Sequence, residues 1–129
     1  MKNTYIIGEI GQNHNGSVDL AKLIIELISR PVHEDVFGMD FMPMNAVKMT
    51  KRDLSEELAV SQMNQIYDNP NSFGRTYGEH RAFLELDDQA HFEIYKYAKS
   101  LGLDFIETLC AKGCLSLLKL FTPDRLKVA

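Results

Sequence analysis

Apolar positions along the chain follow two different periods, and this pattern predicts short strands that alternate with helices. Residues 5–10 form a β-branched, apolar run that ends in the Gly- and Asn-rich turn 11–16. The stripe that follows repeats at the three- and four-residue spacing of a helix, and Pro31 ends it. The stripe consists of Leu20, Leu23, Ile24, Leu27 and Ile28.

The same reasoning along the rest of the chain predicts four strands and three main helices. The strands cover residues 5–10, 45–50, 104–109 and 126–129, and the helices cover 20–28, 87–101 and 112–121. In the second strand, Val47 and Met49 share one face, whereas Ala46, Lys48 and Thr50 share the other. Strands that alternate with helices indicate βαβ units and a parallel sheet.

Two segments do not fit this alternation and are interpreted as insertions. Residues 31–44 are rich in Met and are predicted to be irregular. Residues 51–78 form a long polar segment with a helix expected at 55–65, and loops of this length are usually functional or disordered. The donor-rich segment 76–81 is expected to precede the helix at 87–101, as part of a site or as a solvated approach to that helix.

Length and composition narrow the classes of protein. The chain has 129 residues and a net charge of −4, which gives no electrostatic signature of nucleic-acid binding. It contains no apolar run of the roughly 18–20 residues that cross a bilayer, and residues 1–7 lack a signal core. Cys110 and Cys114 are expected to be reduced thiols of a cytoplasmic protein, with no membrane or nucleic-acid partner.

Polar side chains near the ends of the predicted strands carry the candidate chemistry, since ligands of parallel β/α folds bind there. Glu9, Lys48 and Thr108 lie near the ends of the first three strands, and Lys127 lies in the fourth. A lysine inside a buried strand needs a partner or a ligand. Two such lysines suggest one shared anion, a phosphate or a carboxylate. The alternative is that each lysine pairs with a nearby acid or extends to the rim.

The turn after the first strand is a second candidate. Asn13 and His14 offer donors there, although the spacing is not that of a dinucleotide-binding loop. The alternative is a plain turn with His14 exposed. The four histidines do not form a metal-ligand pair in sequence, so we expect no metal site from this chain alone. They are His14, His33, His80 and His91.

Five segments, in this order, resemble the sialic acid synthase family, which includes the legionaminic and pseudaminic acid synthases. The resemblance covers the N-terminal part of that family's catalytic barrel. The segments are Ile7–Gly16, Asn45–Lys48, Thr76–Leu86, Tyr97–Thr108 and Arg125–Ala129.

This resemblance implies an enzyme that condenses phosphoenolpyruvate with an N-acetylated amino sugar to a nine-carbon 2-keto acid and releases phosphate. Lys48 and Lys127 match the lysines that hold phosphoenolpyruvate, and Thr108 matches a hydroxyl at that site. Glu9 matches an active-site carboxylate, so Glu9, Lys48 and Lys127 are the expected catalytic residues. Asn13 and His14 are expected to bind substrate. Thr50 departs from the family, which often has glutamine there.

The resemblance also implies what lies outside the chain. A (β/α)8 barrel needs about 250 residues, so we expect residues 1–129 to form the N-terminal half of a TIM barrel, truncated in its fourth strand. The family's divalent metal (manganese or magnesium), its metal-binding histidines, its antifreeze-like domain and its homodimer would belong to the complete enzyme. Two alternatives remain: a truncated or split product that is inactive without a separate C-terminal half, and another phosphoenolpyruvate-condensing barrel that acts on a sugar phosphate.

Overall fold

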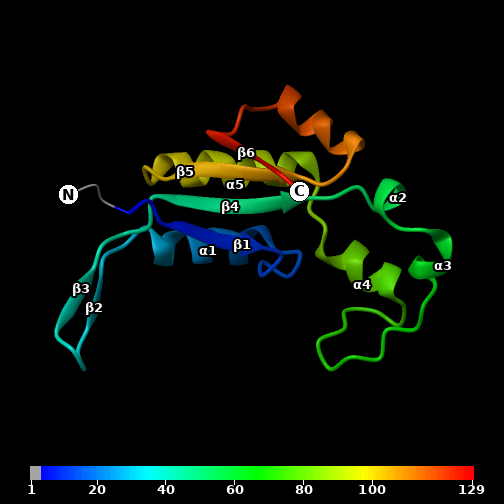
Figure 1. The fold of residues 1–129 in the computed structure, drawn as a ribbon, viewed down its shortest axis with the longest axis horizontal. Coiled ribbons are helices and arrows are strands. Elements are labelled where there is room, and N and C mark those ends of the chain that lie inside the picture. The colour runs from blue at the N-terminus through cyan, green and yellow to red at the C-terminus, as the bar shows by residue number, and fades with distance from the viewer. Residues whose placement is uncertain (1–3) are drawn as a thin grey trace.

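The centre of the molecule is one four-stranded parallel sheet, seen in a computed structural model that describes residues 4–129 (Figure 1). Residues 1–3, which belong to the stretch examined for a signal core, lie outside the described residues. The strands run in the order β1-β4-β5-β6, and every neighbouring pair is parallel. Their bounds are Ile7–Gly11 for β1, Ala46–Lys51 for β4, Asp104–Leu109 for β5 and Arg125–Val128 for β6. The predicted parallel α/β fold is confirmed.

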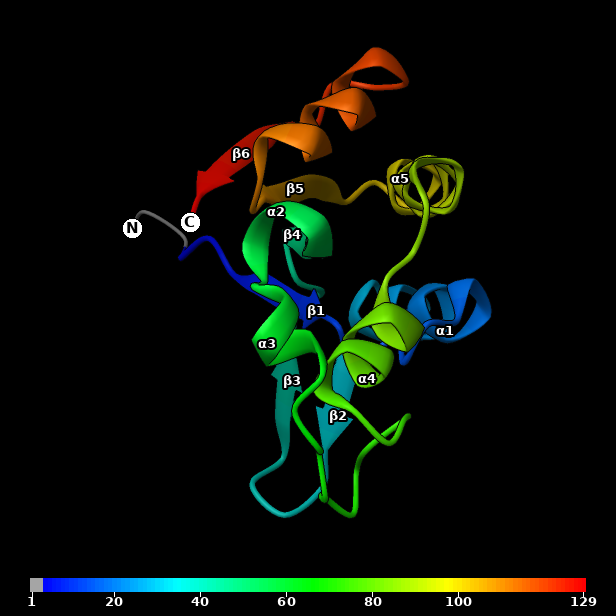
Figure 2. The same cartoon turned by 90° about the vertical axis from the view of Figure 1, so that its right-hand side faces the viewer.

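Two long helices cover one face of this sheet (Figure 2). Helix α1 (Val18–Ile28) begins at Ser17, whose hydroxyl accepts a hydrogen bond from the backbone N–H of Leu20. Helix α5 (Asp88–Ser100) begins at Asp87, which caps it in the same way. The apolar core lies between these helices and the sheet. Its members include Ile10, Ala21, Ile25, Val47, Met49, Ile94, Ala98 and Phe105.

The alternation of side chains along β4 agrees with the sequence prediction. Val47 and Met49 are fully buried in the core under the helices. Lys48 and Thr50 point to the opposite face and remain partly exposed. No helix of residues 4–129 covers that second face in Figure 2, although Thr108, which lies on it, is only 4% exposed.

The prediction that residues 31–44 are irregular is wrong. They contain an antiparallel hairpin, β2 (Val32–Glu34) and β3 (Met39–Phe41), that projects from the body of the molecule (Figure 1). Gly38 allows the turn with a φ of +60°, and the Glu34 carboxylate accepts two backbone N–H groups of the turn. Strands of three residues are too short for a clear alternating pattern.

The long segment between β4 and α5 also differs from its prediction. Instead of one helix at 55–65 it holds two single-turn helices, α2 (Leu54–Glu57) and α3 (Val60–Met63), separated where Leu58 adopts an extended conformation. Residues 76–81 do not merely precede a helix: Thr76 caps an additional helix, α4 (Tyr77–Leu84). These three helices lie at the carboxyl ends of the strands (Figure 2).

The last predicted helix is a 3₁₀ helix, η1 (Lys112–Lys119), which leads into β6. Within residues 4–129 we find no helix with both the length and the apolar character that a bilayer span needs.

Candidate functional site

Lys48 is the centre of a polar group on the open face of the sheet. Its ammonium forms an ion pair with the Glu9 carboxylate and donates a hydrogen bond to the Thr108 hydroxyl, with the two atoms 3.4 Å apart. The parallel register explains the grouping, because Glu9 lies opposite Lys48 and the strand of Thr108 is the next one along. The structure therefore brings together three of the predicted site residues, one from each of β1, β4 and β5.

Lys127 extends this group to the fourth strand. It lies opposite Thr108 in the β5–β6 register and is exposed. Lys48, by contrast, has a side chain that is only 12% exposed, whereas 52% of the Glu9 side chain is exposed. A hydroxyl thus lies between two strands that each carry a lysine. We refer to Glu9, Lys48, Thr108 and Lys127 as the strand-end group.

The other two predicted substrate-binding residues, Asn13 and His14, differ in how exposed their side chains are. Asn13 is exposed on the turn after β1. His14 is only 1% exposed, and its Nδ1 accepts a hydrogen bond from the backbone N–H of Gly16 at 3.1 Å. Burial, with the nearby His91, lowers the pKa of His14 to about 4, so this imidazole is neutral at pH 7. The alternative of an exposed His14 is wrong, and substrate binding by either residue stays a prediction.

One buried polar pair, Glu107 and His91, was not predicted from the sequence. Glu107 of β5 is fully buried beneath α5, where its carboxylate Oε2 lies 3.0 Å from Nδ1 of the buried His91. Burial raises the pKa of Glu107, against the opposing effects of His91 and of two lysines on β4. A glutamate in the middle of an apolar strand was the available signal, because a buried carboxylate requires a partner.

The third strand-end lysine, Lys51, is already bonded. It donates a hydrogen bond to the backbone carbonyl of Leu86 at 2.5 Å and lies 3.6 Å from a carboxylate oxygen of Asp88. Cys110 and Cys114 are both free thiols, as expected, and burial raises the pKa of each. None of these contacts involves the strand-end group.

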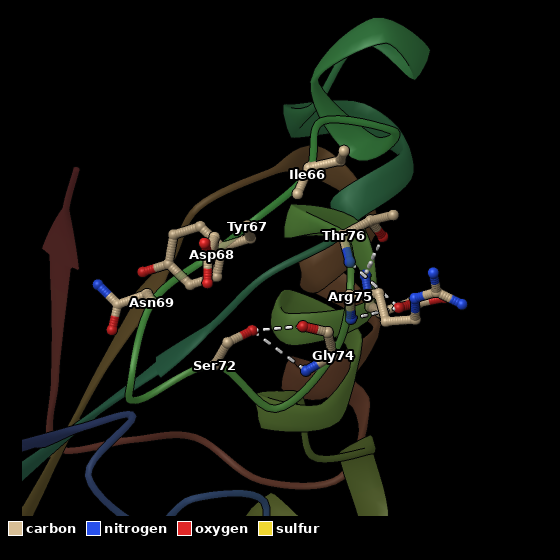
Figure 3. A pocket seen from close by; sticks show the side chains of 9 residues that line it. Ile66, Tyr67, Asp68, Asn69, Ser72, Gly74, Arg75 and Thr76 are labelled. Carbon is tan, nitrogen blue, oxygen red and sulfur yellow. Dashed lines mark hydrogen bonds between the residues drawn. The ribbon is translucent and has the colours of Figure 1, made fainter.

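A separate cavity of about 610 Å³ lies in the loop before α4 and at the start of that helix (Figure 3). Glu79 closes one side by accepting hydrogen bonds from the backbone N–H groups of Arg75 and Thr76, at 2.7 and 3.1 Å. Several polar groups of the donor-rich segment are therefore used to cap α4. The cavity shares no residue with the strand-end group. Its lining consists of Ile66, Tyr67, Asp68, Asn69, Ser72, Gly74, Arg75, Thr76 and Glu79.

Comparison with proteins of known sequence gives related synthases, although no family model matches the chain. The chain is 30% identical over 125 residues to N-acetylneuraminate-9-phosphate synthase of Drosophila melanogaster, a match that covers 96% of this chain and 30% of that protein. It is 33% identical over 101 residues to the Homo sapiens protein of the same name, covering 78% and 25%. N,N'-diacetyllegionaminic acid synthase of Campylobacter jejuni matches at 33% identity, covering 84% and 29%.

Solved structures show the same fold. A sialic acid synthetase from Leptospira borgpetersenii superposes with a TM-score of 0.66 at 19% identity, covering 98% of this chain and 36% of that one. A spore coat polysaccharide biosynthesis protein E from Chromobacterium violaceum superposes with a TM-score of 0.64 at 20% identity, covering 95% and 33%. The chain thus spans about a third or less of the length of these proteins.

Fold and site together define the class: a β/α protein of the TIM-barrel type, with lysines, a hydroxyl and a carboxylate gathered on its parallel strands. Within that class, the chain belongs to the sialic acid synthase family and corresponds to the N-terminal part of its members. The resemblance stated from the sequence is confirmed.

Proposed function

We propose that this chain provides the phosphoenolpyruvate site of a sialic acid synthase-type enzyme, which joins phosphoenolpyruvate to an N-acetylated amino sugar and releases phosphate. The observation that carries the proposal is the largely buried Lys48, bonded to Thr108 and to a more exposed Glu9. An ammonium in this position favours an anionic ligand that can replace Glu9 as its partner. Lys127, opposite Thr108, is the second cation available to the same ligand.

The chemistry of phosphoenolpyruvate matches this arrangement. The molecule carries a phosphate and a carboxylate, so two lysines on different strands can each take one anionic group. The Thr108 hydroxyl can donate to an oxygen between them once Lys48 has turned to the ligand. In the proposed reaction the methylene carbon of the enol attacks the sugar aldehyde, whose oxygen takes up a proton. Water then adds to the phosphate-bearing carbon, and phosphate leaves that carbon by C–O cleavage, which gives the 2-keto group. Fixed ammonium groups stabilise the negative charge on the departing phosphate.

The divalent metal of the family does not fit the donor set of this part of the chain. Residues 4–129 contain no cluster of three His, Cys, Asp or Glu side chains that could hold a metal ion. Glu9, the one carboxylate in the strand-end group, is engaged by Lys48.

The proposal is tested by titrating the isotope-labelled 129-residue chain with phosphoenolpyruvate and following its NMR spectrum. We expect the largest shifts at Lys48, Thr108 and Lys127, and none at the exposed Lys119 on η1. Pyruvate, which lacks the phosphate, is the matched control ligand and should cause weaker shifts at higher concentration. Shifts confined to the separate cavity around Glu79 would contradict the proposal.

Turnover is a separate question from binding. Because the strand-end group offers no set of metal ligands, we expect the purified chain to release no phosphate from phosphoenolpyruvate in the presence of manganese and an N-acetylated hexosamine. A phosphate-release assay measures this. Steady turnover by the chain alone would show that residues 1–129 suffice for the chemistry, and the alternative of an inactive product would be wrong.

A further inference from the structure

The hairpin β2–β3 concentrates exposed apolar side chains in a short stretch of the chain. Six large apolar residues between positions 32 and 42 are each at least half exposed. Apolar surface that is gathered in this way marks an interaction site on a soluble protein. The strand-end group makes no use of the hairpin, which projects from the body of the molecule (Figure 1). The six residues are Val32, Val36, Phe37, Met39, Phe41 and Met42.

The register of the two strands places three of these side chains on one face of the hairpin. Val32 lies opposite Phe41, and Met39 lies opposite Glu34. Opposed residues of an antiparallel pair point to the same side, and so do alternate residues of one strand, so all four share a face. Val32, Met39 and Phe41 are 54%, 51% and 50% exposed. We refer to these three residues as the hairpin face.

Within the described residues 32–41, no free charge lies on the hairpin face. Glu34 is turned to the tip, where its carboxylate oxygens accept hydrogen bonds from the backbone N–H groups of Val36 and Phe37, both at 2.8 Å. The charged pair of the hairpin lies on the opposite face, with 2.6 Å between Nδ1 of His33 and Oδ1 of Asp40. A basic partner would find its acids only on that opposite face. The uncharged face can meet a copy of itself without like-charge repulsion.

We propose that the hairpin is a self-association surface, on which a second copy of this chain packs its own hairpin face about a two-fold axis. The same residues of both copies meet in such a contact. The two ribbons stack face to face at about 10 Å, the usual spacing of packed sheets. The flexible side chains of Met39 and Met42 adapt to the surface of the other copy.

The amount of apolar surface on the hairpin fits a reversible dimer. The six side chains together offer on the order of 600 Å² per copy, against roughly 800 Å² per partner in a standard interface. Interfaces at this lower limit are typical of transient complexes. We therefore expect association that depends on concentration.

The proposed contact lies away from the strand-end group. The hairpin follows α1 and immediately precedes β4, so it lies at the amino ends of the parallel strands. Helices α2, α3 and α4 lie at the other end of the sheet (Figure 2). A dimer formed through the hairpin leaves the open face of the sheet uncovered. The inference therefore goes beyond the proposed function and does not depend on it.

Sedimentation equilibrium of the 129-residue chain tests the proposal. The average mass should rise from that of one chain toward that of two between about 1 μM and 1 mM protein. Phe41→Glu brings a carboxylate from each copy into the contact and should weaken association by at least about tenfold. Val60→Glu is the matched control, because it adds the same charge at an apolar position of α3 that is 76% exposed. It should associate as the unmodified chain does.

Two results of this measurement would overturn the inference. One is the mass of a single chain at every concentration. The other is equal association by Phe41→Glu and the unmodified chain, which would mean that the copies meet elsewhere, such as at the open edges of the sheet. Circular dichroism of each variant establishes that it is folded.

A second measurement needs no substitution. In an equal mixture of isotope-labelled and unlabelled chains, filtered NMR spectra detect only contacts between copies. We expect such contacts between the methyl groups of Val32 or Met39 and the ring of Phe41, and none from Val60. Contacts between copies that involve only β1 and β6 would overturn the inference even if Phe41→Glu failed to fold.

Discussion

Lys48 shows how one residue can be stable in the empty protein and yet available for a ligand. Its side chain is only 12% exposed, and its ammonium has two partners, the Glu9 carboxylate and the Thr108 hydroxyl. Glu9 is half exposed, so water can hydrate it when a ligand takes its place. The ion pair therefore compensates the buried charge without closing the site.

Gly16 is a second residue on which the site region depends. It ends the turn after β1 with a φ of +72°, and a Cβ atom there would lie 2.3 Å from the backbone carbonyl oxygen of Phe83 in α4. Gly102, after α5, has a similar φ of +78° but open space around it. The two glycines thus share a left-handed backbone conformation and differ in the close approach to a neighbouring backbone.

This pair gives a matched prediction. Gly102→Ala should lower the free energy of unfolding by about 1–2 kcal/mol, the usual penalty for a left-handed non-glycine residue. Gly16→Ala should lower it further, because the carbonyl of Phe83 must also move. Urea unfolding of both variants measures the difference. Equal losses would mean that the turn after β1 does not pack against α4 as described.

At the scale of the elements, α4 depends on Thr76, the residue that caps it. The Thr76 hydroxyl accepts a hydrogen bond from the Glu79 N–H, and the Glu79 carboxylate accepts one from the Thr76 N–H in return. This capping box satisfies donors that the helix leaves free. The same two residues line the cavity in Figure 3, so the start of the helix forms part of the cavity wall.

Thr76→Ala should therefore lower the free energy of unfolding by about 1 kcal/mol, the usual value of such a cap. The substitution should also speed up hydrogen exchange in α4 more than in α5, because the lost cap acts locally. Thr122→Ala, at an exposed position outside the helices, is the control and should have little effect. Unchanged exchange in α4 after Thr76→Ala would show that the capping box does not stabilise this helix.

The elements also show which parts of the structure could be predicted from sequence. The helix α1 and the strands of the sheet have apolar periodicity because they bury one face, so burial is visible in the residues themselves. The hairpin β2–β3 buries almost nothing, and its exposed Val36, Phe37 and Met42 follow no face that a pattern could reveal. Helix α4 was missed because its stability comes from Thr76 and Glu79 rather than from an apolar stripe.

The candidate site also contains some contacts that could be predicted from the sequence and others that could not. The grouping of Glu9, Lys48 and Thr108 could be predicted, since parallel strands bring their ends to one edge of a sheet. The contact between Glu107 and His91 depends on the rotation of α5 over β5, which no single element specifies. The burial of His14 likewise results from packing beneath neighbouring elements, although its sequence position is in a turn.

For the molecule as a whole, polar contacts join the strands at the end of the sheet away from the site. The Tyr5 hydroxyl, just before β1, donates to an Asp104 carboxylate oxygen of β5 at 2.5 Å, and Arg125 of β6 lies 2.6 Å from the same atom. The hydrogen bond from Tyr5, and then the hydrogen bond and the charge of Arg125, lower the pKa of Asp104. These bonds connect β1 with β5 and β6 across the intervening β4.

This network predicts part of the stability in acid. A carboxylate whose pKa is lowered by folding stabilises the protein above its unfolded value of about 3.9, and this contribution is lost as the pH falls through the folded value. Asp104→Asn should therefore lower the free energy of unfolding near neutral pH and should show a smaller decline below pH 4. Denaturant unfolding across the pH range measures it, with the exposed Asp68→Asn as control. Parallel curves for Asp104→Asn and the unmodified chain would contradict the role of the network.

The central claim is that Lys48 belongs to a phosphoenolpyruvate site, and calorimetric titration of two lysine variants tests it most directly. A hydrogen bond to a charged group contributes about 1.5–3 kcal/mol, so Lys48→Met should weaken phosphoenolpyruvate binding by at least about tenfold. Lys119→Met, an exposed lysine on η1, should bind as the unmodified chain does. If folded Lys48→Met binds phosphoenolpyruvate as tightly as Lys119→Met, the strand-end group is not the anion site.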